Sequence, residues 1–335
     1  MKEYNLVTIL SIDGGGVKGL LPARILEEIR KRLDTAGEKR RFFDLFDLIA
    51  GTSTGALIAL GLSLKNPAGG DKFSASEIVD IYKTRGIDIF PPRHLNAVQT
   101  AVQAFRFKHP AVSFEKLLSE FFGDNTLKDA ETNLLITSFD TEAMEPHCMK
   151  RRPQIGDWVN DYNYYMRDAA RASGAAPTYF PPAQISPVGK KQLKFSLVDG
   201  AVFANNPSGL AYVEASKIFP KETEFLILSL GTGNSKHGYP YKEVHSWGYM
   251  EWINPIKGFP IGAMMSSGQS EAVNHQLKRL DNVHYIRLNT VLSGATRSMD
   301  DTSNTNIKRL SCSADKMIDE FSDQIDEVCQ ILSSK

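Results

Sequence analysis

Ser53 is the residue with the clearest potential for covalent chemistry, because it stands at the centre of Gly51-Thr52-Ser53-Thr54-Gly55. In a G-x-S-x-G pattern, a sharp turn between a strand and a helix exposes the serine, and the glycines tolerate the close backbone. An apolar run over 45–50 and a small-residue apolar run over 56–60 favour that context here. Ser53 is therefore the candidate nucleophile, and an ordinary glycine-serine turn is the alternative.

A glycine-rich segment, Asp13-Gly14-Gly15-Gly16-Val17-Lys18-Gly19, offers backbone donors for the same chemistry. It follows a predicted strand over 6–12 and precedes a predicted helix over 20–33. A turn of this kind points unpaired N–H groups at a negative charge, aided by the positive end of the helix macrodipole. The charge would be an oxyanion or a phosphate, and a tight turn without a ligand is the alternative.

The same glycines, Gly14, Gly16 and Gly19, also have the spacing of a dinucleotide-binding turn. That unit requires a second strand ending in an acidic residue about twenty positions on, whereas residues 31–41 are charged and turn-like. A Walker A loop is excluded because Leu20, not lysine, follows Gly19. The sequence therefore lacks the features that would confirm a dinucleotide-dependent oxidoreductase.

Asp199 is the candidate base. It follows a short predicted strand over 195–198 and precedes Gly200, and ligands bind at the carboxyl ends of strands in an α/β sheet. The alternative is a plain Asp-Gly turn. Because a carboxylate is a weak base for a serine hydroxyl, we expect surroundings that raise the Asp199 pKa or strongly stabilise an oxyanion.

Acyl transfer to serine requires a nucleophile, a base and oxyanion donors, and the three motifs supply all of them. A Ser–His–Asp triad would instead use a histidine after Asp199. The candidates are His237, His245, His275 and His284. None lies in a motif that would bring it to Ser53, so we favour a Ser53–Asp199 dyad.

The elements that must position these residues alternate along the chain, which predicts an α/β protein. Further strands are expected over 133–139, 224–230 and 283–288, and helices over 163–171, 208–218, 260–280 and 313–332. No repeat, low-complexity linker or composition shift marks a boundary. We therefore expect a single domain over 1–335, with a motif-bearing core at about 6–210 that residues 211–335 complete.

The amino-acid composition limits the kinds of molecule that the protein is expected to bind. Lys plus Arg and Asp plus Glu both number 39, so no global field favours nucleic acid, and no nucleic-acid binding is expected. The three cysteines match no metal spacing or disulfide framework, and the absence of an apolar signal segment predicts a cytoplasmic protein. An apolar stripe with basic ends over 96–107 suits a membrane-contacting or lid helix, with an ordinary core helix as the alternative.

Four blocks of the sequence closely resemble the patatin-like phospholipases. They are Asp-Gly-Gly-Gly-x-Lys-Gly, Gly-Thr-Ser-Thr-Gly, Ala-Pro-Thr-Tyr-Phe-Pro-Pro, and Asp-Gly-Ala followed by Asn-Asn-Pro, all between residues 10 and 207. The resemblance implies a three-layer α/β/α patatin-like fold with a central, mostly parallel sheet. It also implies hydrolysis of fatty acyl esters of phospholipids or related lipids, without calcium or another cofactor.

Carried over by position, the resemblance implies that Ser53 is the nucleophile, Asp199 its partner, and Gly14, Gly15 and Gly16 the oxyanion hole. Other matching motif positions are Asp13, Lys18, Gly51, Gly55, Pro177 and Gly200. Lys18 stands where the family has Arg or Lys, and Pro177 lies in the block that packs beside the dyad. No metal ligand is implied.

The resemblance leaves other readings open. A catalytically idle lipid-binding or storage protein with the same fold is the runner-up, and the intact Ser53 and Asp199 speak against it. Substrate lipids imply transient contact with membranes. Some bacterial relatives are defence effectors switched on by cyclic nucleotides, but this chain has no visible nucleotide-binding motif. The sequence leaves open whether another small molecule activates the protein, and it does not indicate an oligomeric state.

Overall fold

The computed structural model describes residues 6–91, 107–152, 162–219, 224–234, 238–254, 257, 259–292, 294 and 298–335. The strands in these residues are β1 (Leu6–Ile12), β2 (Leu48–Thr52), β3 (Asn133–Asp140), β4 (Glu145–Arg151), β5 (Ala183–Ile185), β6 (Phe195–Asp199), β7 (Glu224–Leu230) and β8 (Val283–Leu288).

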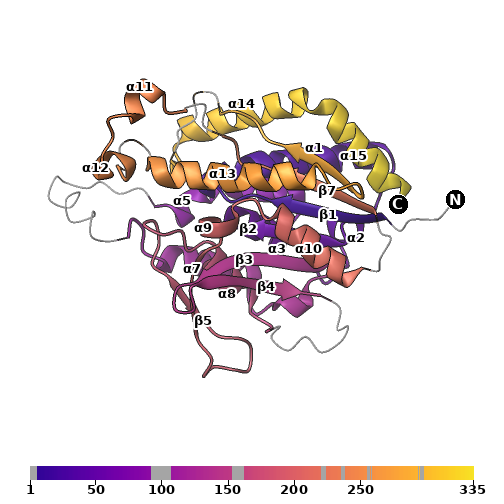
Figure 1. Cartoon of the computed structure of the whole chain (residues 1–335). Helices are drawn as coiled ribbons and strands as arrows, with labels where there is room; N and C mark the ends of the chain where they lie inside the picture. The colour runs from indigo at the N-terminus through magenta and orange to yellow at the C-terminus, as the bar shows by residue number, and fades with distance from the viewer. Residues whose placement is uncertain are drawn as a thin grey trace.

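The helices fall into an amino-terminal and a carboxyl-terminal group (Figure 1). The first group is η1 (Gly16–Gly19), α1 (Leu20–Thr35), α2 (Phe42–Leu45), α3 (Thr54–Leu62), α4 (Ala75–Thr84), α5 (Gly86–Ile89), α7 (Val112–Phe122), η2 (Leu127–Asp129) and α8 (Met166–Ser173). The second is α9 (Ala201–Ala204), α10 (Ser208–Ile218), α11 (Tyr241–Val244), α12 (Tyr249–Trp252), α13 (Pro260–Leu277), α14 (Asn304–Glu320) and α15 (Ser322–Ser334).

The described strands form one mixed sheet in the order β5-β6-β3-β2-β1-β7-β8, and β4 pairs with β3. The pairs β3–β2, β2–β1, β1–β7 and β7–β8 are parallel. The pairs β3–β4, β3–β6 and β5–β6 are antiparallel. The carboxyl ends of β1, β2 and β7 therefore meet at one edge of the sheet, where the motifs lie.

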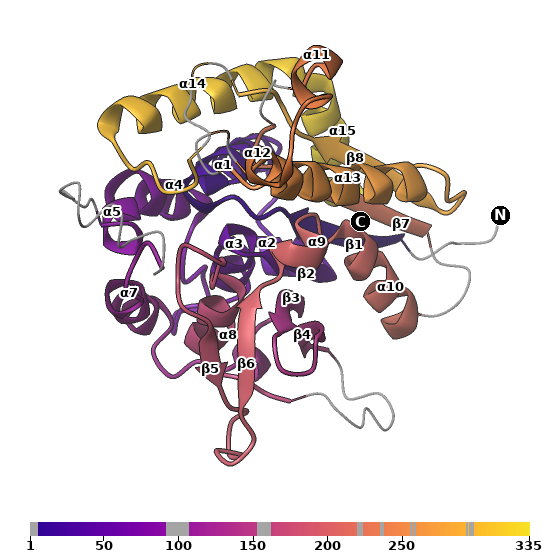
Figure 2. The same ribbon diagram turned by 60° about the vertical axis from the view of Figure 1, so that its left-hand side comes forward.

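Both faces of the central strands are covered, which explains their nearly continuous apolar sequence. Along β1, Leu10 and Ile12 join the core beneath α1 and α3, whereas Val7 and Ile9 pack with α10 on the opposite face. This alternation produces three layers, helix on sheet on helix. Figure 2, turned from the first view, shows α10 on the other side of the central strands from α1 and α14.

The residues beyond 211 belong to the same body as the motif-bearing core. β7 and β8 extend the central sheet, and α14 and α15 pack on α1. One apolar core runs from Leu10 on β1 to Leu332 on α15. The single domain over 1–335 stays a prediction.

Four predicted elements differ clearly from the structure or lie outside it. The helix predicted over 163–171 is α8, which begins only at Met166 and runs on to Ser173. The strand predicted over 45–50 is wrong at its start, because residues 42–45 form α2 and pairing with β1 and β3 carries β2 on to Thr52. The single helix predicted over 313–332 is two helices, which meet at Phe321, a residue with φ −108° and ψ 21°. Most of the stripe over 96–107 lies outside the described residues.

Candidate active site

Ser53 occupies a strained turn between β2 and α3. Its φ of 55° and ψ of −119° lie in a region that residues other than glycine rarely adopt. Neighbouring glycines permit the turn: a Cβ on Gly51 would lie 2.3 Å from the Gly55 carbonyl oxygen, and one on Gly55 would lie 2.1 Å from the Ile12 carbonyl oxygen. The elbow that the sequence predicted is therefore held by close backbone packing on β1.

The register of β3 brings Asp199 to Ser53. Thr52, at the end of β2, pairs with Thr137 of β3. Asp199, at the end of the antiparallel strand β6, pairs with the next residue, Ser138. β2 and β6 thus approach each other end to end along the same side of β3, so the residue after Thr52 lies beside Asp199.

The Asp199 carboxylate accepts hydrogen bonds from the Ser53 hydroxyl and from the Ala201 N–H, the latter at 2.8 Å. Asp199 is 2% exposed, whereas Ser53 is partly exposed. Burial raises the pKa of Asp199 to about 7, although both hydrogen bonds oppose the rise. The raised pKa agrees with the expectation from the sequence, since it makes this carboxylate a better base near neutral pH.

The glycine-rich loop lies against the elbow. A Cβ on Gly14 would be 3.2 Å from the Cβ of Ser53. The Gly14 N–H donates to the Asn205 carbonyl oxygen at 3.1 Å and is already used, whereas no acceptor in the described part of the chain is recorded for the N–H groups of Gly15 and Gly16. The available donors of the loop are therefore those of Gly15 and Gly16.

Met299 fixes the far side of this loop. Gly16 has φ +60°, and a Cβ there would lie 2.2 Å from the Met299 carbonyl oxygen. The same oxygen accepts a hydrogen bond from the Val17 N–H at 2.8 Å. A glycine is thus required at position 16 by both its backbone conformation and its space.

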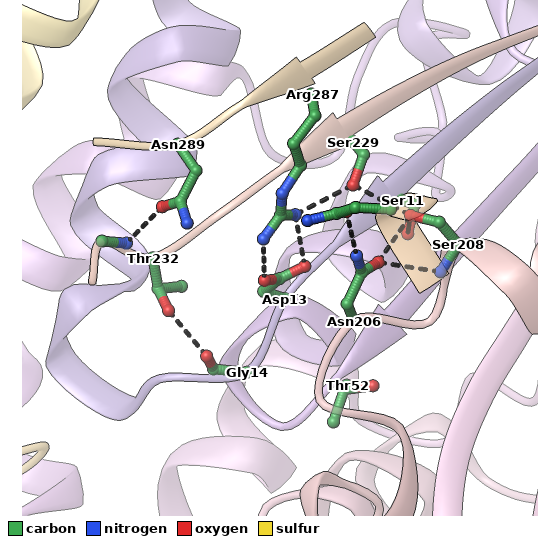
Figure 3. Close-up of polar contacts among 12 residues, drawn as sticks. Ser11, Asp13, Gly14, Thr52, Asn206, Ser208, Ser229, Thr232, Arg287 and Asn289 are labelled. Atoms are coloured by element: carbon green, nitrogen blue, oxygen red, sulfur yellow. Dashed lines mark hydrogen bonds and ion pairs between the residues drawn. The ribbon is translucent and has the colours of Figure 1, made fainter. Parts of the chain in front are cut away.

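An ion pair holds the start of the loop (Figure 3). Arg287 on β8 reaches across β7 and donates from Nη1 and Nη2 to the two Asp13 carboxylate oxygens, at 2.8 and 2.6 Å; Asp13 is buried and the Arg287 side chain is 9% exposed. Arg287 Nη1 also donates to Ser229 Oγ at 2.9 Å. Further along, Thr232 Oγ1 donates to the Gly14 carbonyl oxygen at 2.7 Å.

A second buried polar cluster fixes the chain after Asp199 (Figure 3). Ser208 Oγ lies 2.8 Å from Ser11 Oγ on β1 and 2.8 Å from Ser229 Oγ on β7. The Ser208 N–H donates to Asn206 Oδ1 at 3.1 Å. The Asn-Asn-Pro block is thereby tied to the two strands that carry the glycine-rich loop.

The block that contains Pro177 packs beside the two candidate catalytic residues through other residues. Ser173 Oγ accepts the Ser53 N–H at 2.8 Å, and the Ala175 carbonyl oxygen accepts the Asp199 N–H at 3.0 Å. Pro177 itself is exposed. Gly200 has a packing role, because a Cβ there would lie 2.1 Å from Thr137 Oγ1.

The sequence did not single out Ser173, Arg287 or Met299. Ser173 stands in a recognised block, so its neighbours gave a signal for it. The sequence contained no signal for Arg287 or Met299, because each reaches the site from a distant part of the chain.

Lys18 is half-buried in η1, and burial lowers the pKa of its amine. Three of the four histidines considered for a triad lie in the described residues and are exposed: His245, His275 and His284. His284 pairs with Glu327, at 3.2 Å, and no contact with Ser53 is recorded for any of the three. His237 lies outside the described residues.

The described residues hold no group of three or more His, Cys, Asp or Glu side chains that could bind a metal ion. In the same residues, no helix is both long and apolar enough to cross a bilayer.

A three-layer α/β/α fold that carries a serine on a strand–helix elbow is typical of lipid acyl hydrolases as a class. Residues 10–212 match the family described as "Patatin-like phospholipase", and the chain belongs to this family.

Alignments with several similar proteins span most of the chain. It is 34% identical to "Patatin-like protein 2" of Arabidopsis thaliana, over 94% of this chain and 83% of the relative. It is 30% identical to "Probable inactive patatin-3-Kuras 1" of Solanum tuberosum, over 90% and 83%. The solved structure of VipD from Legionella pneumophila matches 95% of this chain and 67% of that chain, with a TM-score of 0.42 and 14% identity.

Proposed function

We propose that this protein is a serine lipid acyl hydrolase of the phospholipase A type, a carboxylic ester hydrolase in which Ser53 and Asp199 form the catalytic dyad. The observation that carries the proposal is the hydrogen bond from the Ser53 hydroxyl to the buried Asp199, made on a strained elbow at the carboxyl edge of the sheet. A partly exposed hydroxyl beside a carboxylate whose pKa is about 7 has the features of an activated nucleophile.

In the first half of the reaction, Asp199 accepts the Ser53 proton as Oγ bonds to the carbonyl carbon of the acyl ester. The carbonyl oxygen becomes an oxyanion, and the unused N–H groups of Gly15 and Gly16 stabilise it. The intermediate then collapses: the ester C–O bond breaks, and the leaving alcohol takes the proton from Asp199. An acyl-serine and a lysolipid or other alcohol result.

In the second half, Asp199 accepts a proton from water, which attacks the acyl-serine. The Ser53 Oγ–carbon bond breaks, and the proton returns to Ser53. The products are a free fatty acid and the regenerated dyad. Every proton in this sequence passes through the one carboxylate, so the histidines are not required.

Release of fatty acid from phospholipid vesicles tests the proposal. We expect Ser53→Ala to lower turnover by more than about a thousandfold while the circular dichroism spectrum and the unfolding midpoint stay close to those of the parent. Ser216→Ala, an exposed serine on α10, is the matched control and should retain full turnover. Substantial hydrolysis by folded Ser53→Ala would overturn the assignment of the nucleophile.

The histidines provide a second test of the dyad. Alanine at His237, His245, His275 or His284 should leave turnover within about twofold of the parent. Loss of turnover in one of these variants, with folding intact, would contradict the dyad in favour of a triad.

A catalytically idle lipid-binding or storage protein is the second candidate, since one similar relative carries the name "Probable inactive patatin-3-Kuras 1". The same vesicle assay separates the two functions, because an idle protein would bind lipid and release no fatty acid. The proposal also places the protein in the cytoplasm and has it contact membranes transiently, because its phospholipid substrates are in the membranes. Activation by a cyclic nucleotide is not part of the proposal.

A further inference from the structure

Large apolar side chains are exposed together on the segment that contains α11, α12 and the start of α13. Seven of the sixteen large apolar side chains recorded as exposed in the described residues belong to it: Tyr241, Tyr249, Met250, Phe259, Ile261, Met264 and Met265. Tyr241, Tyr249 and Met250 are 80%, 77% and 69% exposed. We call these seven residues the α11–α13 patch. A cluster of this kind on a monomer marks a surface that another phase or molecule covers.

Partly buried aromatic rings pack together within the same segment as the patch. Trp247 contacts Tyr239 and Trp252 edge to face, at centroid distances of 5.2 and 5.1 Å, and the Lys257 ammonium lies 4.5 Å from the Trp247 ring centroid. Trp252 also lines an open apolar hollow together with Ile261, Met264 and Met265. Tyr, Trp and Lys are the residues that anchor proteins at the boundary between lipid headgroups and acyl chains.

The patch lies near the carboxyl edge of the sheet, where the candidate active site is located. α13 packs on α9, the helix that follows Asp199, and Gln269 Nε2 donates to the Val202 carbonyl oxygen at 3.3 Å. Figures 1 and 2 both place α9 and α13 at the carboxyl edge of the central strands, and α12 contacts α13. A flat surface that rested on the patch would therefore lie over the approach to Ser53.

The short helices of the patch contribute little to the protein core. α11 and α12 bury no residue, and α13 buries only Pro260, Asn274 and Leu277. Their apolar atoms thus remain available for burial elsewhere. A second copy of the chain seated there would obstruct the route of a lipid to Ser53, whereas a bilayer would deliver it.

The net charge of the segment indicates which kind of bilayer it suits. Between residues 238 and 265, Lys242 and Lys257 balance Glu243 and Glu251, so the net charge is zero with His245 neutral. Attraction to anionic headgroups therefore contributes little, and insertion of aromatic and methionine side chains supplies the binding. A zwitterionic surface fits this segment.

We propose that the α11–α13 patch docks the protein on zwitterionic phospholipid bilayers, with the edge of the sheet that carries Ser53 facing the membrane. The use of this docking rests on the proposed hydrolase function, since the bilayer holds the substrate. The binding itself does not depend on catalysis, and this allows the two proposals to be tested separately.

Binding is measured first, on the 335-residue chain with Ser53→Ala so that the vesicles stay intact. Flotation with phosphatidylcholine vesicles should give at least about tenfold weaker binding for Tyr249→Ser/Met250→Ser/Met264→Ser. The matched control is Met144→Ser/Val188→Ser/Val213→Ser, which removes three exposed apolar side chains elsewhere and should bind like Ser53→Ala alone. Adding phosphatidylglycerol should change the binding by less than about threefold.

Turnover is measured second, with Ser53 intact. The patch variant should hydrolyse a soluble short-chain ester at the parental rate and phosphatidylcholine vesicles about tenfold more slowly. Equal vesicle binding by the patch and control variants overturns the docking proposal. So does binding only to anionic vesicles, or a change of oligomeric state in the patch variant without a change in vesicle binding. Absence of ester turnover in every protein, with patch-dependent binding retained, overturns the hydrolase function and leaves the docking proposal supported.

Discussion

Replacing Asp199 by Asn should abolish turnover and, at neutral and alkaline pH, stabilise the folded protein. Asn keeps the shape of the side chain and can still accept a hydrogen bond from Ser53 or from the Ala201 N–H. It removes a carboxyl group that is 2% exposed and whose pKa burial raises from 3.8 to about 7. The parent therefore ionises a group in a place that disfavours its charge, and the variant does not.

The sign and size follow from proton linkage. Folded Asp199 binds its proton more tightly than the unfolded carboxyl does, so its contribution to stability is complete below about pH 4 and declines as the pH rises to about 7. A pKa difference of about three corresponds to about 4 kcal/mol lost above pH 7, since each pKa unit is worth about 1.4 kcal/mol. Between pH 5 and pH 8 the loss is about 3 kcal/mol.

Urea unfolding at pH 5, 6.5 and 8 measures this difference. The free energy of unfolding of Asp199→Asn, relative to the parent, should rise by about 3 kcal/mol from pH 5 to pH 8. Ser53→Ala is the control: it retains Asp199 and loses a hydrogen bond that lowers its pKa, so its stability should decline with pH at least as steeply as the parent's. A difference between Asp199→Asn and the parent that does not change with pH would refute the reasoning.

The same pKa governs the reaction, because Asp199 must be ionised to accept the Ser53 proton. In the parent, kcat/KM should rise tenfold for each pH unit below about pH 7 and level off above it. A profile without this acidic limb would contradict the role of Asp199 as the base.

Gly55→Ala should lower the free energy of unfolding by about 3 kcal/mol or prevent folding, because its Cβ would lie 2.1 Å from the Ile12 carbonyl oxygen. Gly61→Ala on the same helix has its nearest atoms at 3.7 Å and should be neutral or stabilising by up to about 1 kcal/mol in the same urea assay. Equal midpoints for the two variants would refute this. Arg287→Met should cost about 3 to 5 kcal/mol by leaving Asp13 buried and unpaired, and among folded molecules it should lower kcat more than it raises KM. Addition of Asp13→Asn should recover part of the stability, and no recovery would show that the ion pair is not the cause.

Several elements could be predicted from the sequence because their apolar patterns are continuous and their ends are marked. The predicted bounds 6–12, 224–230 and 283–288 match β1, β7 and β8, and 208–218 matches α10. Parallel strands buried on both faces give long apolar runs, which need no knowledge of their partners to be recognised. The α/β class followed from them.

Elements that depend on a partner were less predictable. β4 has the sequence EPHCMKR, with exposed and polar positions, and β5 is only three residues long, so neither has a strand pattern of its own. Both exist because β3 and β6 offer unpaired edges to them. The limit of β2 at Thr52 was also set by pairing, since the sequence pattern had ended the strand at residue 50.

The sequence by itself determined the parts of the candidate site that are local: a serine between glycines after a strand, a glycine loop before a helix, and a carboxylate at a strand end. These are short-range properties, because a turn depends on the few residues that form it. Only the tertiary structure decided how the parts meet. The antiparallel entry of β6 against β3 brings Asp199 beside Ser53, and Asn205 occupies the Gly14 N–H, which leaves Gly15 and Gly16 as donors. Arg287 pairs with Asp13 although 274 positions separate them, because β7 and β8 lie beside β1 in the folded sheet.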